Sequence, residues 1–301
     1  MPTRRSQGML GLIRSHKQFA NTVATQWMMR IDPPAETVAR LRMSGTTASA
    51  VSGLGMPGIL ISPRRLLAED AVILHLHGGA YMSGGILQCR ALASPICAAA
   101  GIRILTFSYR LAPKHPYPAQ LEDALTAYRF LRDSGYAPDR IALLGESAGG
   151  NLALALTLRL RDLGEPLPAA IALLSPWVDL AQTGESYQTQ REIDATLNAG
   201  ELMEAAIDFS GGEARLKDPE ISPVYADFTG FPPVMIHCGA NELLLSDSEM
   251  LERALLRDHV DVRLIRWAGM CHVFQAFGFE ESRASNQQTG LFLRRHLIRE
   301  E

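Results

Sequence analysis

The sequence predicts an α/β fold in which helices cover both faces of a mostly parallel central sheet. Short apolar runs rich in Val, Ile and Leu alternate along the chain with longer amphipathic stretches. An order of strand, helix, strand is typical of parallel sheets that are buried on both faces. With 301 residues, of which 47% are hydrophobic and 20% charged, the chain can bury such a core in one large domain or two small ones.

Seven apolar runs are expected to form the strands. They are residues 58–63, 71–77, 102–109, 140–145, 170–176, 233–239 and 262–269, the first of them near an edge of the sheet. Amphipathic patterns typical of helices lie in three of the intervals, at 118–134, 149–163 and 246–258. No internal repeat interrupts this order.

Two regions do not follow the alternation. Residues 1–45 are predicted to form helices before the sheet, and a polar, then helical insertion falls between two strands at about 180–210. Ligands of open α/β sheets bind outside the carboxyl ends of the strands, so both segments are expected to form a cap there. The main domain is then residues 46–301, with the cap insertion inside it. Large apolar residues of the cap either line a pocket or pack into the core: Met28, Met29, Met203, Ile207 and Phe209.

Charge and composition exclude several classes of partner. The formal net charge of −3 offers no broad positive field to a phosphate backbone, so nucleic acid is not expected as a partner. No apolar run approaches the roughly 18 residues that a membrane span needs, and no secretory signal is expected at the start. The four cysteines show no CxxC spacing, so reduced, mostly buried thiols and a cytoplasmic location are expected.

Residues 145–149, Gly-Glu-Ser-Ala-Gly, form a G-x-S-x-G pattern between a predicted strand and a predicted helix. Glycines two positions before and after Ser147 allow a turn tight enough to lift its Oγ clear of the sheet. The helix N-terminus favours negative charge that develops beside this hydroxyl. The alternative is a small-residue turn that only packs strand against helix. The strand–turn–helix context favours Ser147 as a nucleophile.

A serine nucleophile needs a histidine base and a carboxylate that orients it, in the chain order Ser, acid, His on this kind of sheet. His272 follows the last predicted strand on a Gly-containing loop and is the predicted base. Glu242, Asp247 and Asp179 follow strands and are the candidate acids. Glu242 is preferred because it lies closest to the end of its strand, whereas Asp247 falls where a helix begins. The sequence alone leaves this choice open.

The stretch His-Gly-Gly-Ala at 77–80 follows a predicted strand upstream of the serine. Glycines let backbone N–H groups approach a substrate oxygen closely, and removal of one such donor typically costs about a hundred- to a thousandfold in rate. Gly78, Gly79 and Ala148 are therefore predicted to form an oxyanion hole. The alternative is a plain Gly-rich turn.

No cofactor or metal is predicted. The segment GLGMPG at 53–58 matches the dinucleotide pattern G-x-G-x-x-G, but that motif must follow a strand and open a helix. Here Pro57 interrupts it and an extended run follows, so a loop or hairpin connection is expected. No P-loop and no zinc-type spacing of His and Cys is present in the sequence.

Several motifs occur in an order that resembles one known family, the bacterial hormone-sensitive-lipase-like esterases of the α/β-hydrolase fold. The resemblance covers about residues 75–274. It rests on HGGAY (77–81), YRLAPKHPYPA (109–119) with Asp123, GESAGG (145–150), SPWVDL (175–180) and MCHVF (270–274). It implies that residues 46–301 form an α/β-hydrolase catalytic domain. It also implies that Tyr109, Arg110 and Asp123 support the site rather than take part in the chemistry.

The resemblance implies a carboxylesterase that cleaves short- to medium-chain monoacyl esters through an acyl-enzyme, with Ser147, His272 and Glu242 as the triad. The family often has aspartate as its acid, but a subgroup uses glutamate, which supports Glu242. Lactone hydrolases and acetyl-ester or acetyl-amide hydrolases occur among similar proteins, and acyl transfer to an alcohol uses the same triad. A non-catalytic receptor is disfavoured because His272 is kept. A homodimer formed through the edge strand VRLIRW is a further expectation from relatives.

Overall fold

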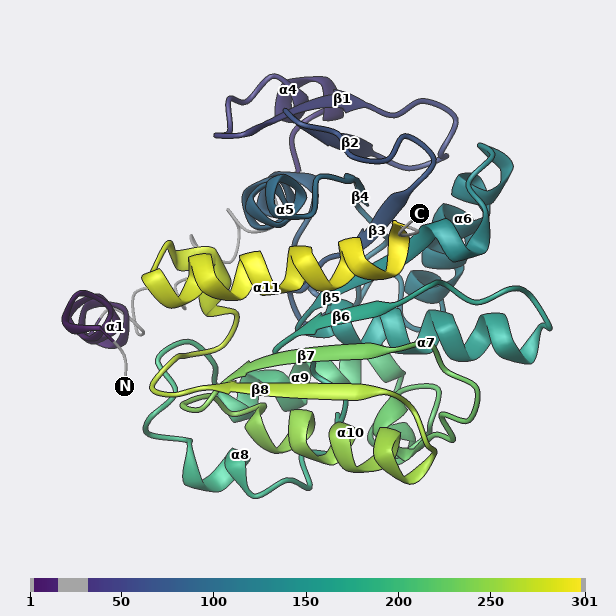
Figure 1. The fold of residues 1–301 in the computed structure, drawn as a ribbon. Coiled ribbons are helices and arrows are strands. Elements are labelled where there is room, and N and C mark those ends of the chain that lie inside the picture. The colour runs from purple at the N-terminus through teal and green to yellow at the C-terminus, as the bar shows by residue number, and fades with distance from the viewer. Residues whose placement is uncertain (1–2, 16–31, 299–301) are drawn as a thin grey trace.

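The computed structural model describes residues 3–15 and 32–298, which contain one twisted eight-stranded sheet (Figure 1). The strand order is β1-β2-β4-β3-β5-β6-β7-β8. β1 and β2 pair antiparallel, as do β2 and β4, and every other neighbouring pair is parallel. The strands are β1 (Thr46–Ala50), β2 (Gly58–Pro63), β3 (Val72–Leu76), β4 (Arg103–Phe107), β5 (Ile141–Glu146), β6 (Ile171–Leu174), β7 (Val234–Gly239) and β8 (Val262–Trp267). The predicted fold class is confirmed.

Helices cover both faces of the sheet. α5 (Ile86–Ala100) and α11 (Glu280–Leu297) lie on one face, and α6 (Ala119–Asp133), α7 (Ala148–Asp162) and α10 (Leu245–Arg257) on the other (Figure 1). Successive residues of β3 point to opposite faces, so Ile73 packs in the cluster with α5 and α11, and Leu74 in the cluster with α6 and α7. This two-sided burial explains the apolar runs.

Three elements are not predicted by the alternation of apolar runs and amphipathic stretches in the sequence. β1, with the sequence TTASA, is an edge strand with a single buried residue, so it has little apolar signal. α5 is buried around much of its circumference and carries Pro95, which obscures helical periodicity. α11 packs through small and polar side chains: a Cβ at Gly290 would lie 2.7 Å from the backbone N of Ala100. Residues 53–57 lie in the hairpin connection between β1 and β2, and Gly58 begins β2, so this segment is a loop as the sequence predicts.

The predicted cap regions carry helices. α1 (Arg4–Ser15) and α4 (Ala35–Ala39) precede the sheet, and α8 (Ser186–Thr189) and α9 (Ala199–Ser210) lie between β6 and β7. Residues 16–31, with Met28 and Met29, lie outside the described part of the chain. Phe209 at the end of α9 is buried and stacks on Tyr81, with 3.8 Å between ring centroids. Met203 and Ile207 also pack against the core.

No helix in the described ranges has the length and apolar character needed to span a bilayer. All four cysteines are free and buried, as predicted.

Six parallel strands end at one edge of the sheet. β3, β4, β5, β6, β7 and β8 run in the same direction, so the loops after them meet at that edge. These loops carry the predicted site residues Gly78, Ser147, Glu242 and His272.

Candidate active site

Ser147 occupies a sharp turn between β5 and α7. Its backbone has φ 55° and ψ −122°, a left-handed conformation that costs a non-glycine residue about 1–3 kcal/mol. Two backbone hydrogen bonds tie it to the end of β6 and the loop that follows: Ser147 N donates to Leu174 O at 3.0 Å, and Trp177 N donates to Ser147 O at 3.0 Å. The fold therefore fixes the turn from both sides.

The two motif glycines are required by close backbone approach. A Cβ on Gly145 would lie less than 3.0 Å from the carbonyl of Gly149, and a Cβ on Gly149 would lie less than 3.0 Å from the carbonyls of Leu76 and His77. Real Cβ atoms do not come so close to backbone. The turn can thus press against the end of β3 only when both positions lack a side chain.

His272 reaches Ser147 from the loop after β8. Its Nε2 lies 3.0 Å from Ser147 Oγ, within hydrogen-bond distance. Both side chains are mostly buried, with residue exposures of 7% for Ser147 and 8% for His272. Gly239, at the end of β7, lets this loop come close, since a Cβ there would clash with the carbonyls of Met270 and Cys271.

Glu242 faces the other nitrogen of the imidazole. Its Oε1 lies 3.7 Å from His272 Nδ1, and neither atom has a hydrogen-bond partner among the described residues. The second oxygen, Oε2, accepts hydrogen bonds from Gly239 N and Ser175 Oγ, both at 2.8 Å. The carboxylate is fully buried, so these donors replace the water that it lost.

The two other candidate acids are engaged elsewhere. Asp247 Oδ2 accepts hydrogen bonds from the backbone N of Val178 and Asp179, at 2.8 and 2.9 Å, and burial raises the pKa of Asp247 well above its usual value. Asp179 accepts hydrogen bonds from Thr183 N at 2.6 Å and Tyr225 OH at 2.8 Å. Of the three carboxylates, Glu242 is the one within ion-pair distance of His272 in the described structure.

The predicted oxyanion donors differ from one another in the structure. Ala148 N lies in the first turn of α7, and Gly79 adopts φ 113°; neither N–H donates a hydrogen bond to the described residues. Gly78 N instead donates to Glu146 Oε1 at 2.8 Å. The Gly78 N–H is therefore already satisfied in this arrangement, and its predicted role toward an oxyanion stays a prediction.

Glu146 was not singled out by the sequence, although it directly precedes the nucleophile. Its Oε2 lies 2.6 Å from His75 Nε2, and with the Gly78 contact it joins β3 to β5 beneath the Gly-rich loop. His77 stacks on Tyr109 at 3.9 Å between centroids, and the Tyr109 hydroxyl donates to His77 O. Burial lowers the pKa of His77 to about 4, so its imidazole is neutral near pH 7.

Tyr109, Arg110 and Asp123 occupy supporting positions. Arg110 Nε lies 3.0 Å from Asp123 Oδ1, which ties the loop after β4 to α6, and Tyr109 lies beneath the Gly-rich loop.

Ser175 is a further residue of the site whose role the sequence does not indicate. It has φ 48° and is fully buried, and its Oγ donates to Glu242 while it accepts from Val273 N at 3.2 Å.

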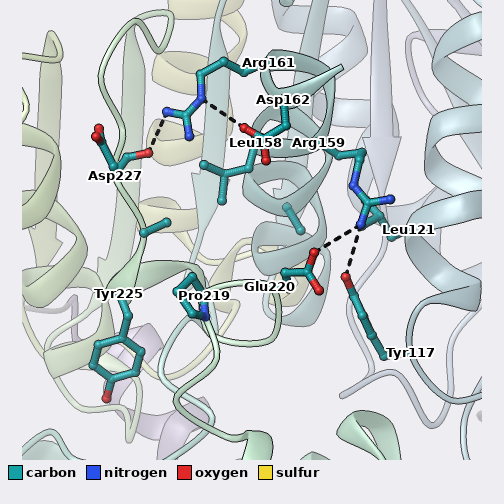
Figure 2. Close-up of a pocket in the computed structure, with 12 residues that line it drawn as sticks. Tyr117, Leu121, Leu158, Arg159, Arg161, Asp162, Pro219, Glu220, Tyr225 and Asp227 are labelled. Atoms are coloured by element: carbon teal, nitrogen blue, oxygen red, sulfur yellow. Dashed lines mark hydrogen bonds and ion pairs between the residues drawn. The ribbon is translucent and has the colours of Figure 1, made fainter. Parts of the chain in front are cut away.

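A surface pocket of about 220 Å³ lies elsewhere, between α7 and the segment that leads into β7 (Figure 2). None of the predicted site residues lines it. Its charged groups pair with one another: Arg159 lies 3.4 Å from Glu220, and Arg161 lies 3.5 Å from Asp162.

The described residues contain no group of three or more His, Cys, Asp or Glu arranged to hold a metal ion.

Residues 73–276 match a family model described as alpha/beta hydrolase fold. An acetyl-hydrolase of Streptomyces hygroscopicus is 39% identical over 75% of this chain and 76% of its own length. A crystal structure of an esterase from the bacterial hormone-sensitive lipase family is 36% identical with a TM-score of 0.88, covering 99% of this chain and 100% of that one. EstE5, in a crystal soaked with p-nitrophenyl butyrate, is 33% identical with a TM-score of 0.89, covering 98% and 99%.

The chain therefore belongs to the alpha/beta hydrolase fold family. Within that fold it is a member of the bacterial hormone-sensitive lipase family of esterases, and it is an enzyme of the serine carboxylesterase type.

Replacing Gly149 with alanine tests the packing of the turn. Because the new methyl group would meet the backbone of β3, which no side-chain rotation relieves, we expect G149A to lose about 3 kcal/mol or more of unfolding free energy. The matched control is G11A in α1, where a Cβ meets nothing within 4 Å and alanine should stabilise the helix by about 0.5–1 kcal/mol. Urea unfolding measures both. Equal stability of G149A and wild type would contradict the packing argument.

Proposed function

We propose that this enzyme hydrolyses short- to medium-chain monoacyl carboxylic esters with Ser147 as nucleophile, His272 as base and Glu242 as the acid. The observation that carries the proposal is the 3.0 Å separation of His272 Nε2 from Ser147 Oγ. The position of Glu242 Oε1 on the Nδ1 side of the same ring, at 3.7 Å, supports it. Such a carboxylate holds the imidazole in the tautomer that can accept the serine proton.

The reaction would proceed in two halves. His272 Nε2 takes the proton of Ser147 as Oγ attacks the ester carbonyl, and the N–H groups of Gly79 and Ala148 stabilise the oxyanion, with Gly78 as the third predicted donor. The alcohol leaves with the proton from His272, which produces an acyl-enzyme on Ser147. Water, deprotonated by His272, then attacks this ester and releases the acid.

Relatives guide the choice of substrate. The acetyl-hydrolase relative and the use of p-nitrophenyl butyrate with EstE5 both support small acyl groups for this chain. Phe209 of the insertion stacks on Tyr81, so the insertion packs against the segment directly after the Gly-rich loop. Acetyl esters and acetyl amides are the second candidate class, because the Streptomyces relative bears that name.

Replacing Ser147 with alanine removes the nucleophile. Loss of a triad serine leaves only binding and oxyanion stabilisation, so we expect kcat/KM toward p-nitrophenyl esters to fall by at least about 10⁴-fold. The measurement is a series from acetate to decanoate on wild type and S147A. We expect kcat/KM of the wild type to be highest for esters with about two to four acyl carbons, in line with the acetyl-hydrolase relative and the use of p-nitrophenyl butyrate with EstE5. Equal hydrolysis by the two proteins would rule out Ser147.

The choice of acid is tested by the matched pair E242Q and D247N. Glutamine can keep an oxygen toward Gly239 and Ser175, but its NH₂ then faces His272 Nδ1 and disfavours the productive tautomer, so kcat should fall by about 10²–10⁴-fold. Asparagine resembles the neutral acid that burial favours at Asp247, so D247N should keep kcat within about threefold. A large loss in D247N with full activity in E242Q would reverse the assignment.

We also propose a homodimer and a cytoplasmic location. β8 pairs with β7 on one side, and its other edge has no strand partner among the described residues, so a second copy can extend the sheet there. The free, buried cysteines support a reducing compartment. Sedimentation of wild type and of a variant with proline at Ile265 tests the dimer: the wild type should sediment as a dimer and I265P as a monomer, and a monomeric wild type would overturn it.

A further inference from the structure

We propose that Asp194, in the insertion between β6 and β7, is a positioning residue for Glu242. The inference rests on the proposed function, because it concerns how the acid of that triad is held. Asp194 lies neither on a strand nor beside Ser147 in the sequence, and no motif of the family resemblance includes it.

Asp194 is a buried carboxylate with two separate sets of contacts. It is 1% exposed. Oδ1 accepts three hydrogen bonds from its own turn: Thr196 N at 2.7 Å, Thr196 Oγ1 at 2.9 Å and Leu197 N at 2.9 Å. Oδ2 reaches out of the turn and accepts from Leu243 N at 2.8 Å. One oxygen thus shapes the insertion, and the other holds the peptide that directly follows Glu242.

The insertion also holds the next carbonyl of that segment. Ser186 Oγ, in α8, donates to Leu243 O, and Ser246 N donates to Ser186 Oγ at 3.0 Å. Both backbone polar groups of Leu243 are therefore bonded to side chains of the insertion. A buried backbone that lost these partners would have to move to find others, because an unsatisfied group costs about 1–3 kcal/mol.

The same turn contacts the histidine loop. Ala195 is buried in a cluster with Met270, Cys271 and Phe274, which flank His272. Burial and, to a smaller extent, the nearby charges of Asp194 and Glu242 raise the pKa of the Cys271 thiol to about 12. Residues 194 and 195 thus touch the loops of the acid and of the base at once, and they fix the separation between the two.

This separation matters because the contact it controls is loose. Glu242 Oε2 is held by Ser175 and Gly239, but Oε1 has only the 3.7 Å approach to His272 Nδ1. A shift of the Leu243 peptide moves the Glu242 backbone and changes that approach. Misplacement by about 1 Å of a group that acts in the transition state can cost up to a hundredfold in rate.

The variant D194N separates the two contact sets. Its single amide oxygen is expected to face the three donors of the turn, which leaves the NH₂ group pointing at Leu243 N–H, donor against donor. The turn then survives and the link to Glu242 is lost. We expect kcat for p-nitrophenyl butyrate to fall about tenfold with KM within about twofold, after normalisation by active-site titration.

A spectroscopic readout distinguishes positioning from general destabilisation. In the complex with a boronic acid that bonds to Ser147, the proton on His272 Nδ1 should give a far-downfield proton resonance in the wild type because Glu242 accepts it. In D194N that resonance should move upfield or vanish. The matched control is T196V, which removes the Thr196 Oγ1 contact but not the Leu243 contact, and it should keep both the resonance and kcat.

A second variant covers the case in which D194N does not fold. S186A removes the side chain that bonds Leu243 O and should reduce kcat in the same direction. A wild-type kcat, or an unchanged downfield resonance, in a folded D194N or S186A would overturn the inference. A wild-type kcat in E242Q would show that the proposed triad is wrong. A large loss of kcat in E242Q together with a wild-type kcat in D194N would reject only the positioning role of Asp194.

Discussion

The close approach of three backbone segments at the carboxyl edge of the sheet is the constraint on which the site depends. The turn at Ser147 presses α7 against the end of β3, and only glycine fits at 145 and 149. The same crowding recurs at Gly239, where the end of β7 meets the loop that carries His272. Because the backbones nearly touch, side chains from strands far apart in sequence reach one another over about 3 Å.

Buried carboxylates also hold the segments of the site together. Glu146 joins β3 to β5 through Gly78 N and His75, Glu242 is held by Gly239 N and Ser175, and Asp194 links the insertion to Leu243. Each is nearly removed from water, so each must be met by N–H or O–H donors, and these donors fix its orientation. The insertion between β6 and β7 supplies Asp194 and Ser186, which hold the backbone next to Glu242.

The parts of the site that follow local patterns could be predicted from the sequence. Strand positions follow from apolar runs because the sheet is buried on both faces, and the turn at Ser147 follows from glycine spacing. Glu146, Ser175 and Asp194 could not be found in this way. Their partners lie 68, 67 and 49 residues away along the chain, so their contacts exist only once the fold has formed. α11 was missed for a related reason: it buries small and polar residues such as Ser285 and Gly290, which give no hydrophobic period.

The most direct test of the account is identification of the residue that carries the acyl group during turnover. The enzyme would be mixed with p-nitrophenyl butyrate, quenched in acid within the first turnovers, digested and analysed by mass spectrometry. If Ser147 is the nucleophile, the butyryl group will accumulate on the peptide that contains Ser147 in the wild type, and the corresponding peptide of S147A will stay unmodified. Hydrolysis that proceeds with that peptide unmodified and the acyl group on another side chain would contradict it.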